Sequence, residues 1–486
     1  MDRTSRRSPD RWAAGMLMAL GLALYAGTLA PTVLWGDSAG LQRQAALLEV
    51  RGGALGHPLW VVLAHAFTRL PWGDVAWRAN FLAALAGAAT LPLVYLLARR
   101  EGASPWGSAA AAGMLGLSHT FWLHAVQAEV YTLLLWFWAA VLLALPAGLM
   151  QRRPLRWGLA GFLWGLGLAN HLLLAALLPG LLAWLWAERG RGRDAAAFAA
   201  GAGLGLLPLG FLWAWTPPER VYGPLPEVVR GLLCPEAWQV RPRDLALALG
   251  YLAYQFPLTG LLAVAGAAAA WRRAPRRAVA WGLVWAVPWV LALRHHVPDQ
   301  YAFFLPAYLP VALWCGLGYE VLAERWSGGQ ARRAILLALC LALPVGTYWL
   351  APQAAARWPL VPLQVRAIPG RDPWRFFLWP PKADAWGARA YGEAALEAAA
   401  PEALILADWT LQAPLEYLKE VEGMRPDVLV VGTGDLQEPQ AAFLRRACQD
   451  RPCYLADLHP YYDLAAIEKD FVPIPEGVLY RLVPGR

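Results

Sequence analysis

The sequence predicts a mainly α-helical, polytopic membrane protein of about eleven transmembrane helices with a small α/β domain at its C-terminal end. Of the 486 residues, 58% are hydrophobic and 16% are charged, and the mean hydropathy is +0.38. Apolar runs approaching the roughly 20 residues that span a bilayer recur from residue 12 to residue 351. Beyond residue 351, acidic residues and short aliphatic segments replace them. This composition excludes a disordered chain, a disulfide-rich scaffold and a purely soluble enzyme.

Basic residues form short islands between the apolar runs. The islands lie at residues 3–11, 99–100, 152–156, 189–193, 272–277 and 325–333. The positive-inside rule places every island on the cytoplasmic side, so we expect a cytoplasmic N-terminus and an extracytoplasmic C-terminal domain. The net charge of +8 is spread over these islands and not gathered on one face, which predicts a lipid bilayer and no nucleic acid as partner.

The apolar runs between these islands are the predicted transmembrane helices. They cover residues near 12–30, 80–98, 104–119, 130–149, 157–171, 172–187, 195–214, 246–270, 278–293, 302–322 and 334–351. A cleavable secretory signal is the alternative interpretation of the first run, which follows a basic stretch and ends in small residues. We expect the segment to be retained, because its apolar run is long.

Two outer connections, 31–79 and 215–245, are long, and the others are short. The first contains a semi-apolar stretch, Pro58 to Leu70, which His65 and Arg69 interrupt. This pattern is typical of a helix that lies in the membrane interface. Six prolines between 217 and 242 predict an irregular loop for the second connection.

The composition change after residue 351 divides the chain into a transmembrane domain (1–351), a linker (352–382) and an extracytoplasmic α/β domain (383–486). Strands are predicted at 403–407, 426–431 and 453–456, and helices at 414–421 and 437–449. Gly432-Thr-Gly434 lacks the rest of a nucleotide-binding fingerprint and is interpreted as a turn. An oxidising compartment would permit a bridge between Cys448 and Cys453, whose geometry the sequence does not give.

Ionisable residues at the predicted outer face are the candidates for chemistry, because polar groups near membrane depth are kept mainly for function. They fall into four connections: Asp37 and His57 in the first; His119, His124 and Glu129 before the fourth helix; Asn170 and His171 after the fifth; and Arg294, Asp299 and Tyr301 before the tenth. A carboxylate in such a cluster can take the proton from an acceptor hydroxyl while cations steady a phosphate leaving group.

Each candidate also has a structural interpretation. Asp37 suits a helix N-cap, and Glu129 suits the positive end of the fourth helix dipole. His171 could hydrogen-bond between helices. A divalent ion held by Asp37, Glu129 and a histidine is a further alternative that the spacing does not specify. No Cys-x-x-Cys pair with a matching second pair occurs, and we expect no cofactor.

An ordered series of motifs resembles the N-terminal signature of the DUF2723 family, the protein O-mannosyltransferase-like membrane proteins of the GT-C glycosyltransferase superfamily. The matching stretches are Leu29-Ala-Pro-Thr-Val33, Trp35-Gly-Asp-Ser38, Gly56-His-Pro-Leu59, Leu70-Pro-Trp-Gly-Asp-Val-Ala-Trp-Arg-Ala-Asn80, Phe121-Trp122, Ala128-Glu-Val-Tyr131, Gly167-Leu-Ala-Asn-His171, Asp299-Gln-Tyr-Ala-Phe303 and Pro306. They cover most of the membrane part. Family members usually carry another acidic residue shortly after the Asp-Ser pair, where this sequence has Ala39-Gly40-Leu41.

The resemblance implies a GT-C fold, a polyprenyl-phosphate-linked sugar as donor, and Asp37 as the base in the first outer loop. We therefore expect an inverting membrane glycosyltransferase in which Asp37 and Glu129 are catalytic, acting on a protein, lipid or glycan acceptor. The expected substrate-binding residues are His57, Arg78, His124, His171, Arg294, Asp299 and Tyr301. The alternative is a non-catalytic binder or transporter of lipid-linked glycans. The arginine-rich composition and the topology favour a bacterial inner membrane.

Overall fold

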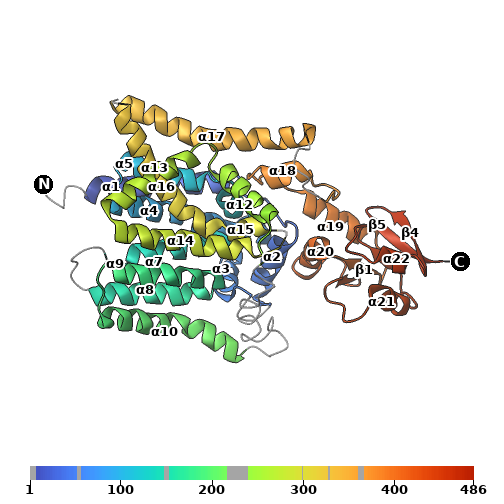
Figure 1. The fold of residues 1–486 in the computed structure, drawn as a ribbon. Coiled ribbons are helices and arrows are strands. Elements are labelled where there is room, and N and C mark those ends of the chain that lie inside the picture. Colours follow the sequence, from blue (N-terminus) through green and yellow to red (C-terminus); the bar gives the residue numbers. More distant parts are fainter. Residues whose placement is uncertain are drawn as a thin grey trace.

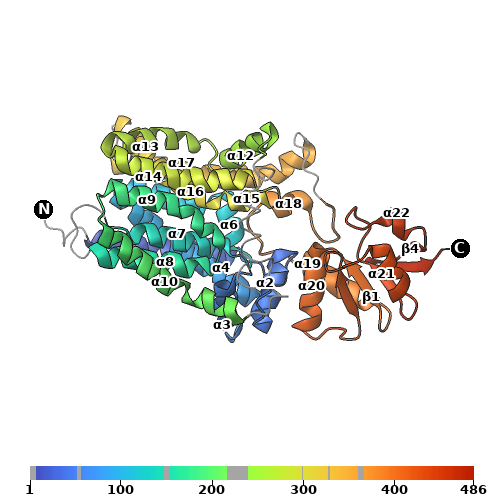
Figure 2. The same cartoon turned by 60° about the horizontal axis from the view of Figure 1, so that its bottom comes forward.

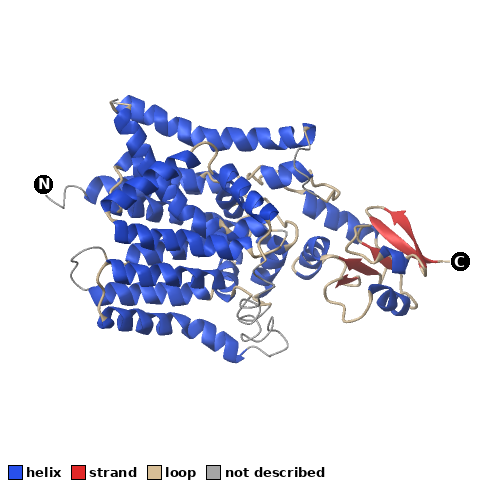
Figure 3. Ribbon diagram, in the orientation of Figure 1, coloured by secondary structure: helices blue, strands red, loops and turns tan. Residues whose placement is uncertain are grey.

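The computed structural model describes residues 7–51, 56–146, 153–215, 239–297, 299–326, 329–358 and 366–485. A bundle of helices forms one end of the molecule, and the strands lie together at the other (Figures 1 and 3). The helices of the bundle are α1 (Arg7–Gly27), α2 (Asp37–Leu47), α3 (Pro58–Thr68), α4 (Val75–Arg100), α5 (Pro105–Gly116), α6 (His119–Ala125), α7 (Tyr131–Ala144), α8 (Arg153–Leu168), η2 (Leu172–Leu177), α9 (Leu178–Ala187), α10 (Gly192–Trp215), α12 (Pro242–Gln255), α13 (Gly260–Arg273), α14 (Pro275–Leu293), α15 (Gln300–Phe303), α16 (Leu305–Arg325) and α17 (Gln330–Arg357).

The bundle is that of a multi-pass membrane protein. Among the described residues, five helices are long and apolar enough to cross a bilayer: α4, α10, α14, α16 and α17. The bent pair α12 and α13 gives a sixth candidate. Several of the other predicted spans coincide with shorter apolar helices, including α7 and the η2–α9 segment. The predicted count of eleven spans therefore stays a prediction.

The predicted continuous helix at 246–270 is wrong, because the chain bends by 93° between α12 and α13. Pro257 lies in the bend and has no N–H to continue the helical hydrogen bonds. Leu258 next to it adopts a left-handed backbone with φ 56°. The helix predicted over Pro58 to Leu70 is present as α3, and its place in the membrane interface stays a prediction. Most of the predicted irregular loop at 215–245 lies outside the described residues.

Small residues let neighbouring helices of the bundle approach closely. A Cβ atom on Gly161 of α8 would lie 2.1 Å from the Phe198 carbonyl oxygen of α10, and one on Gly201 would lie 2.0 Å from the Gly158 carbonyl oxygen. Backbone contact of this kind is how helices associate in a membrane, where burial of apolar surface from water gives no driving force.

The C-terminal part is a small α/β domain, as predicted. It contains α18 (Pro373–Leu378), α19 (Gly387–Ala398), β1 (Leu404–Ala407), α20 (Trp409–Glu420), β2 (Leu429–Gly432), α21 (Gln440–Ala447), β3 (Cys453–Leu455), α22 (Leu464–Ile467), β4 (Phe471–Glu476) and β5 (Leu479–Pro484). The strand order is β2-β1-β3-β5-β4. Strand β1 pairs in parallel with β2 and β3, and β5 pairs antiparallel with β3 and β4. A disulfide joins Cys448 and Cys453, whose Cα atoms are 5.6 Å apart.

The α/β domain shares a hydrophobic core with the first connection of the bundle. Val33, Trp35, Ala39 and Ala76 belong to the same cluster of buried residues as Tyr391 and its neighbours in the domain. Helix α20 lies beside α2 in two views of the molecule (Figures 1 and 2). This packing places the domain directly over the connection that carries Asp37.

Candidate active site

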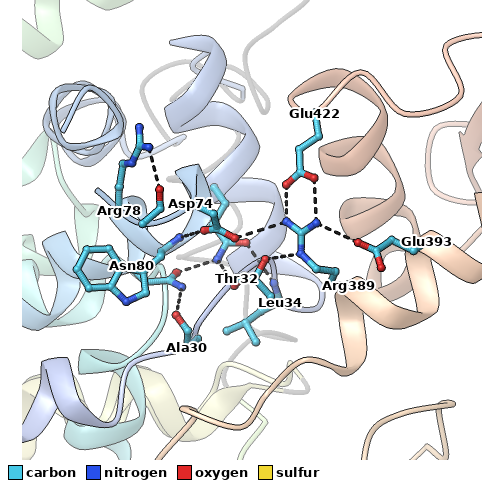
Figure 4. A network of polar contacts seen from close by, with 12 residues as sticks. Ala30, Thr32, Leu34, Asp74, Arg78, Asn80, Arg389, Glu393 and Glu422 are labelled. Atoms are coloured by element: carbon cyan, nitrogen blue, oxygen red, sulfur yellow. Dashed lines mark hydrogen bonds and ion pairs between the residues drawn. The ribbon is translucent and has the colours of Figure 1, made fainter. Parts of the chain in front are cut away.

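Asp37 is the first residue of α2 and does not cap that helix. The N-cap position belongs to Gly36, with φ 54°, and no side chain closes the helix there. The preceding loop is fixed instead by Gln42, whose amide accepts from Leu34 N and donates to Asn80 Oδ1 at 2.7 Å. Asn80 in turn donates to the Ala30 carbonyl at 3.0 Å (Figure 4). The Asp37 carboxylate is therefore available for other partners.

His57 and His171 come from separate connections and stack with their ring centroids 4.9 Å apart. His57 precedes α3 in a left-handed conformation, and its Nδ1 lies 2.8 Å from the Asn170 carbonyl oxygen, to which it donates. His171 Nδ1 accepts from the Leu173 amide at 3.0 Å. Burial lowers the pKa of both imidazoles, so both rings are neutral.

The ring of Tyr131 lies between those of His124 and His171. The His124 ring centroid is 4.8 Å from that of Tyr131 and 6.0 Å from that of Tyr301. His124 Nδ1 is 4.0 Å from Glu129 Oε2. Both ring nitrogens are buried, and among the described residues neither has a hydrogen-bond partner. A buried imidazole without hydrogen-bond partners costs free energy, which makes His124 a candidate for contact with a substrate.

Three carboxylates, Asp37, Glu129 and Asp299, lie within electrostatic reach of one another. Burial raises the pKa of Glu129 well above its ordinary value, and the charges of Asp37 and Asp299 raise it further. Burial, followed by the charge of Asp37, also raises the pKa of Asp299. The raised pKa favours the protonated form of Glu129, which can donate a hydrogen bond but cannot act as a base.

Arg78 and Arg294, the two arginines among the predicted substrate-binding residues, lie on different connections of the bundle. The guanidinium of Arg78 donates to the backbone carbonyls of Thr68 at 2.7 Å, Gly73 at 2.8 Å and Trp72 at 2.9 Å, and so fixes the turn between α3 and α4. Arg294 is the C-cap residue of α14, on the connection that leads to Asp299 and Tyr301.

Two residues from the C-terminal part adjoin this site, and the sequence reasoning missed both. Trp409, the first residue of α20, donates from its indole Nε1 to Asp37 Oδ1 at 2.5 Å. Lys382 is buried and donates to the Trp379 and Pro380 carbonyls. Burial lowers the pKa of His124, and the charge of the nearby Lys382 lowers it further. Lysine stands only at 382, 419 and 469 in this arginine-rich chain, and that rarity was the available signal for Lys382.

Arg389 of α19 fastens the C-terminal domain to the bundle (Figure 4). Its guanidinium donates to Thr32 Oγ1 at 2.7 Å and lies 3.4 Å from the Asp74 carboxylate, both in the first connection. Within the domain it also binds Glu393 and Glu422. Among the residues that the structure describes, no group of three or more His, Cys, Asp or Glu side chains is arranged to hold a metal ion.

Comparisons with known proteins agree with this architecture. Residues 37–191 match the model of the N-terminal domain of the protein O-mannosyl-transferase TMEM260 family. The mouse protein O-mannosyl-transferase TMEM260 is 33% identical over 129 residues, which are 25% of this chain and 18% of the mouse protein. The chain thus spans less than a fifth of the length of that relative.

Solved structures resemble the whole chain. The crystal structure of ArnT from Cupriavidus metallidurans in the apo state superposes with a TM-score of 0.61 at 16% identity, covering 96% of this chain and 97% of that one. The oligosaccharyltransferase of Archaeoglobus fulgidus gives a TM-score of 0.48 at 11% identity, covering 98% of this chain and 74% of that one. The predicted resemblance is thereby confirmed: the chain is O-mannosyltransferase-like over residues 37–191 and has the GT-C fold of ArnT.

Proposed function

We propose that this protein is a membrane glycosyltransferase that moves a sugar from a polyprenyl-phosphate donor to an acceptor hydroxyl, with inversion at the anomeric carbon. The observation that carries the proposal is the convergence of Asp37, Glu129 and Asp299 with three neutral histidines, in a chain with the GT-C fold. A single displacement at a sugar carbon needs one base for the acceptor hydroxyl, and the other polar groups are available to hold the substrates.

In the proposed reaction, Asp37 takes the proton from the acceptor hydroxyl. The acceptor oxygen then forms a bond to the anomeric carbon as the bond from that carbon to the phosphate oxygen breaks. The polyprenyl phosphate leaves with the electron pair of the broken bond, and the displacement inverts the anomeric configuration. Glu129, protonated because of its burial and its acidic neighbours, acts as a hydrogen-bond donor to a substrate oxygen.

The remaining residues of the site bind the substrates in this proposal. His57, His124 and His171, together with Tyr301 and Asp299, line the place where the sugar is held. Arg294 is proposed for the donor phosphate because it lies on the connection that carries Asp299 and Tyr301, and Lys382 is proposed as a second basic side chain because it lies near His124. An acceptor that is a protein, a lipid or a glycan would satisfy the same chemistry.

The reaction is proposed for the extracytoplasmic face of a bacterial inner membrane, with the N-terminus in the cytoplasm. The arginine islands support this orientation. The disulfide between Cys448 and Cys453 also supports it, because such bridges persist in oxidising compartments.

The decisive experiment measures transfer of labelled sugar from polyprenyl-phosphate donors in membranes that contain the wild type, Asp37→Asn or the control Asp427→Asn. Asp427 is exposed and forms an ion pair with Arg425 within the C-terminal domain. Transfer by the wild type and the control, and its loss in Asp37→Asn at equal protein level, are expected. Equal transfer by all three would remove Asp37 from the mechanism. Donor binding without transfer in any of them would favour the binder or transporter.

A further inference from the structure

The hydrogen bond from Trp409 to Asp37 joins the C-terminal domain to the proposed base. Nε1 of the indole lies 2.5 Å from Asp37 Oδ1. Among the described residues, no other side chain or amide hydrogen-bonds the carboxylate, so Oδ2 has no protein partner there. One oxygen is thus fixed by a donor, and the other is left for a substrate proton.

Helix α2 is built to accept the indole. Gly40 lies one turn after Gly36, and a Cβ atom at Gly40 would come within 2.8 Å of Trp409 Cζ2 and 2.9 Å of Cη2. Real Cβ atoms essentially never approach that closely, so any larger residue at this position would displace the ring. The Gly36 amide also donates to the Thr410 carbonyl at 3.2 Å. The two helix starts therefore lie in direct contact.

Helix α20 presents Trp409 from a rigid support. Asp408 caps the helix by accepting from the Thr410 amide at 2.9 Å, and it is itself bound by Arg366 at 2.7 Å. At the other end of α20, Arg43 of α2 forms ion pairs with Glu416 and Glu420. Both ends of α20 are thus anchored, which limits the positions that the indole can take.

We propose that Trp409 is a positioning residue that orients the Asp37 carboxylate, so that the C-terminal domain completes the active site. The inference rests on the proposed glycosyl transfer. A general base works only when its lone pair points at the proton to be removed, and a displacement of about 1 Å can cost about 100-fold in rate. The indole N–H fixes that direction while Oδ2 faces the acceptor.

The test uses the full-length protein in membranes or detergent and measures kcat and KM for the donor. Trp409→Phe keeps an aromatic ring on α20 and removes the N–H donor. We expect kcat to fall about 10-fold or more, as for the loss of an orienting hydrogen bond, with an unchanged KM. Trp386→Phe, at an exposed tryptophan of the same domain, is the matched control and should keep wild-type kinetics.

Gly40→Ala provides a second variant that leaves Trp409 in place but pushes the indole aside. It should lower kcat to a similar extent, and the double variant Gly40→Ala/Trp409→Phe should lose little more than either single one, because both remove the same contact. Wild-type kcat in Trp409→Phe, or a loss carried by KM alone, would overturn the inference. Absence of transfer by the wild type and Trp386→Phe alike would overturn the proposed function together with it.

Discussion

His124 Nδ1 lies 4.0 Å from the Glu129 carboxylate, too far for a hydrogen bond, and no described residue hydrogen-bonds either nitrogen of its ring. An unsatisfied buried polar group costs about 1–3 kcal/mol. The position is therefore destabilising unless an ordered water or a substrate supplies the missing bonds, and we propose that the substrate does.

If His124 binds substrate, its replacement should have opposite effects on stability and on activity. His124→Phe keeps a ring of similar size and removes both unpartnered nitrogens. The thermal midpoint should be unchanged or raised, while transfer falls at least about 10-fold. His65→Phe is the control, since His65 lies on α3 and bonds the Ala45 carbonyl. Reduced stability with full activity in His124→Phe would instead assign the residue to packing.

The buried ammonium of Lys382 predicts a stability that depends on pH. Burial lowers the pKa of Lys382 from 10.5 to about 7, with a smaller opposing effect from Asp384. Below pH 7 the folded and unfolded states both hold the proton. Between about pH 7 and 10.5 the unfolded state holds more protons, so the free energy of unfolding rises with pH.

The size of that rise should be on the order of a few kcal/mol, and Lys382→Met should remove it. Thermal unfolding in detergent from pH 6.5 to 9.5 measures the effect. Lys469→Met, at an exposed position, should reproduce the wild-type slope. Parallel curves for the wild type and Lys382→Met would show that Lys382 titrates as an ordinary lysine.

The contacts of Arg389 should stabilise the packing of the C-terminal domain against the helical bundle. The Arg389 guanidinium forms ion pairs with Glu422, Glu393 and Asp74, and the Arg389 side chain is 18% exposed. Arg389→Met should lower the free energy of unfolding by about 1–3 kcal/mol, since the carboxylates lose their partner. The solvent-exposed pair of Arg375 and Asp384 sets the comparison: Arg375→Met should change stability by less than about 0.5 kcal/mol. Equal effects of the two substitutions would contradict an anchoring role.

Transfer should continue after metal is removed. We propose that Asp37 acts without a bound divalent ion, because one carboxylate base is enough for a single inverting displacement. EDTA at millimolar concentration is therefore expected to leave the initial rate unchanged. A loss that Mg²⁺ or Mn²⁺ restores would revive the metal site considered for Asp37, Glu129 and a histidine.

Sequence patterns predicted the parts of the structure that depend on local periodicity. The apolar runs, α3 and the parallel strands β1, β2 and β3 all follow from spacing within short segments. The hairpin of β4 and β5 was missed because Pro473 and Pro475 lie within β4. Proline is tolerated there because β4 is the edge strand, a position that only the completed sheet defines.

The type and position of the candidate residues identified them in the sequence, but the sequence did not identify the residues that contact them in the fold. Asp37, His57 and His171 stand out as polar residues at the ends of apolar runs. The indole of Trp409 is 372 positions away from Asp37, and no local pattern distinguishes it among 28 tryptophans. Contacts of such separation arise from the docking of α20 on α2, which is a property of the tertiary fold.

The core that Val33, Trp35 and Ala39 share with the C-terminal domain also has a consequence for biosynthesis. These side chains leave the ribosome long before Tyr391, Leu411 and Tyr417, which cover them. Until those later residues are synthesised, the apolar face of the first connection stays uncovered. A nascent chain that stops before α20 would retain its helices in the bilayer and still display that face, and so become a substrate for chaperones and proteases.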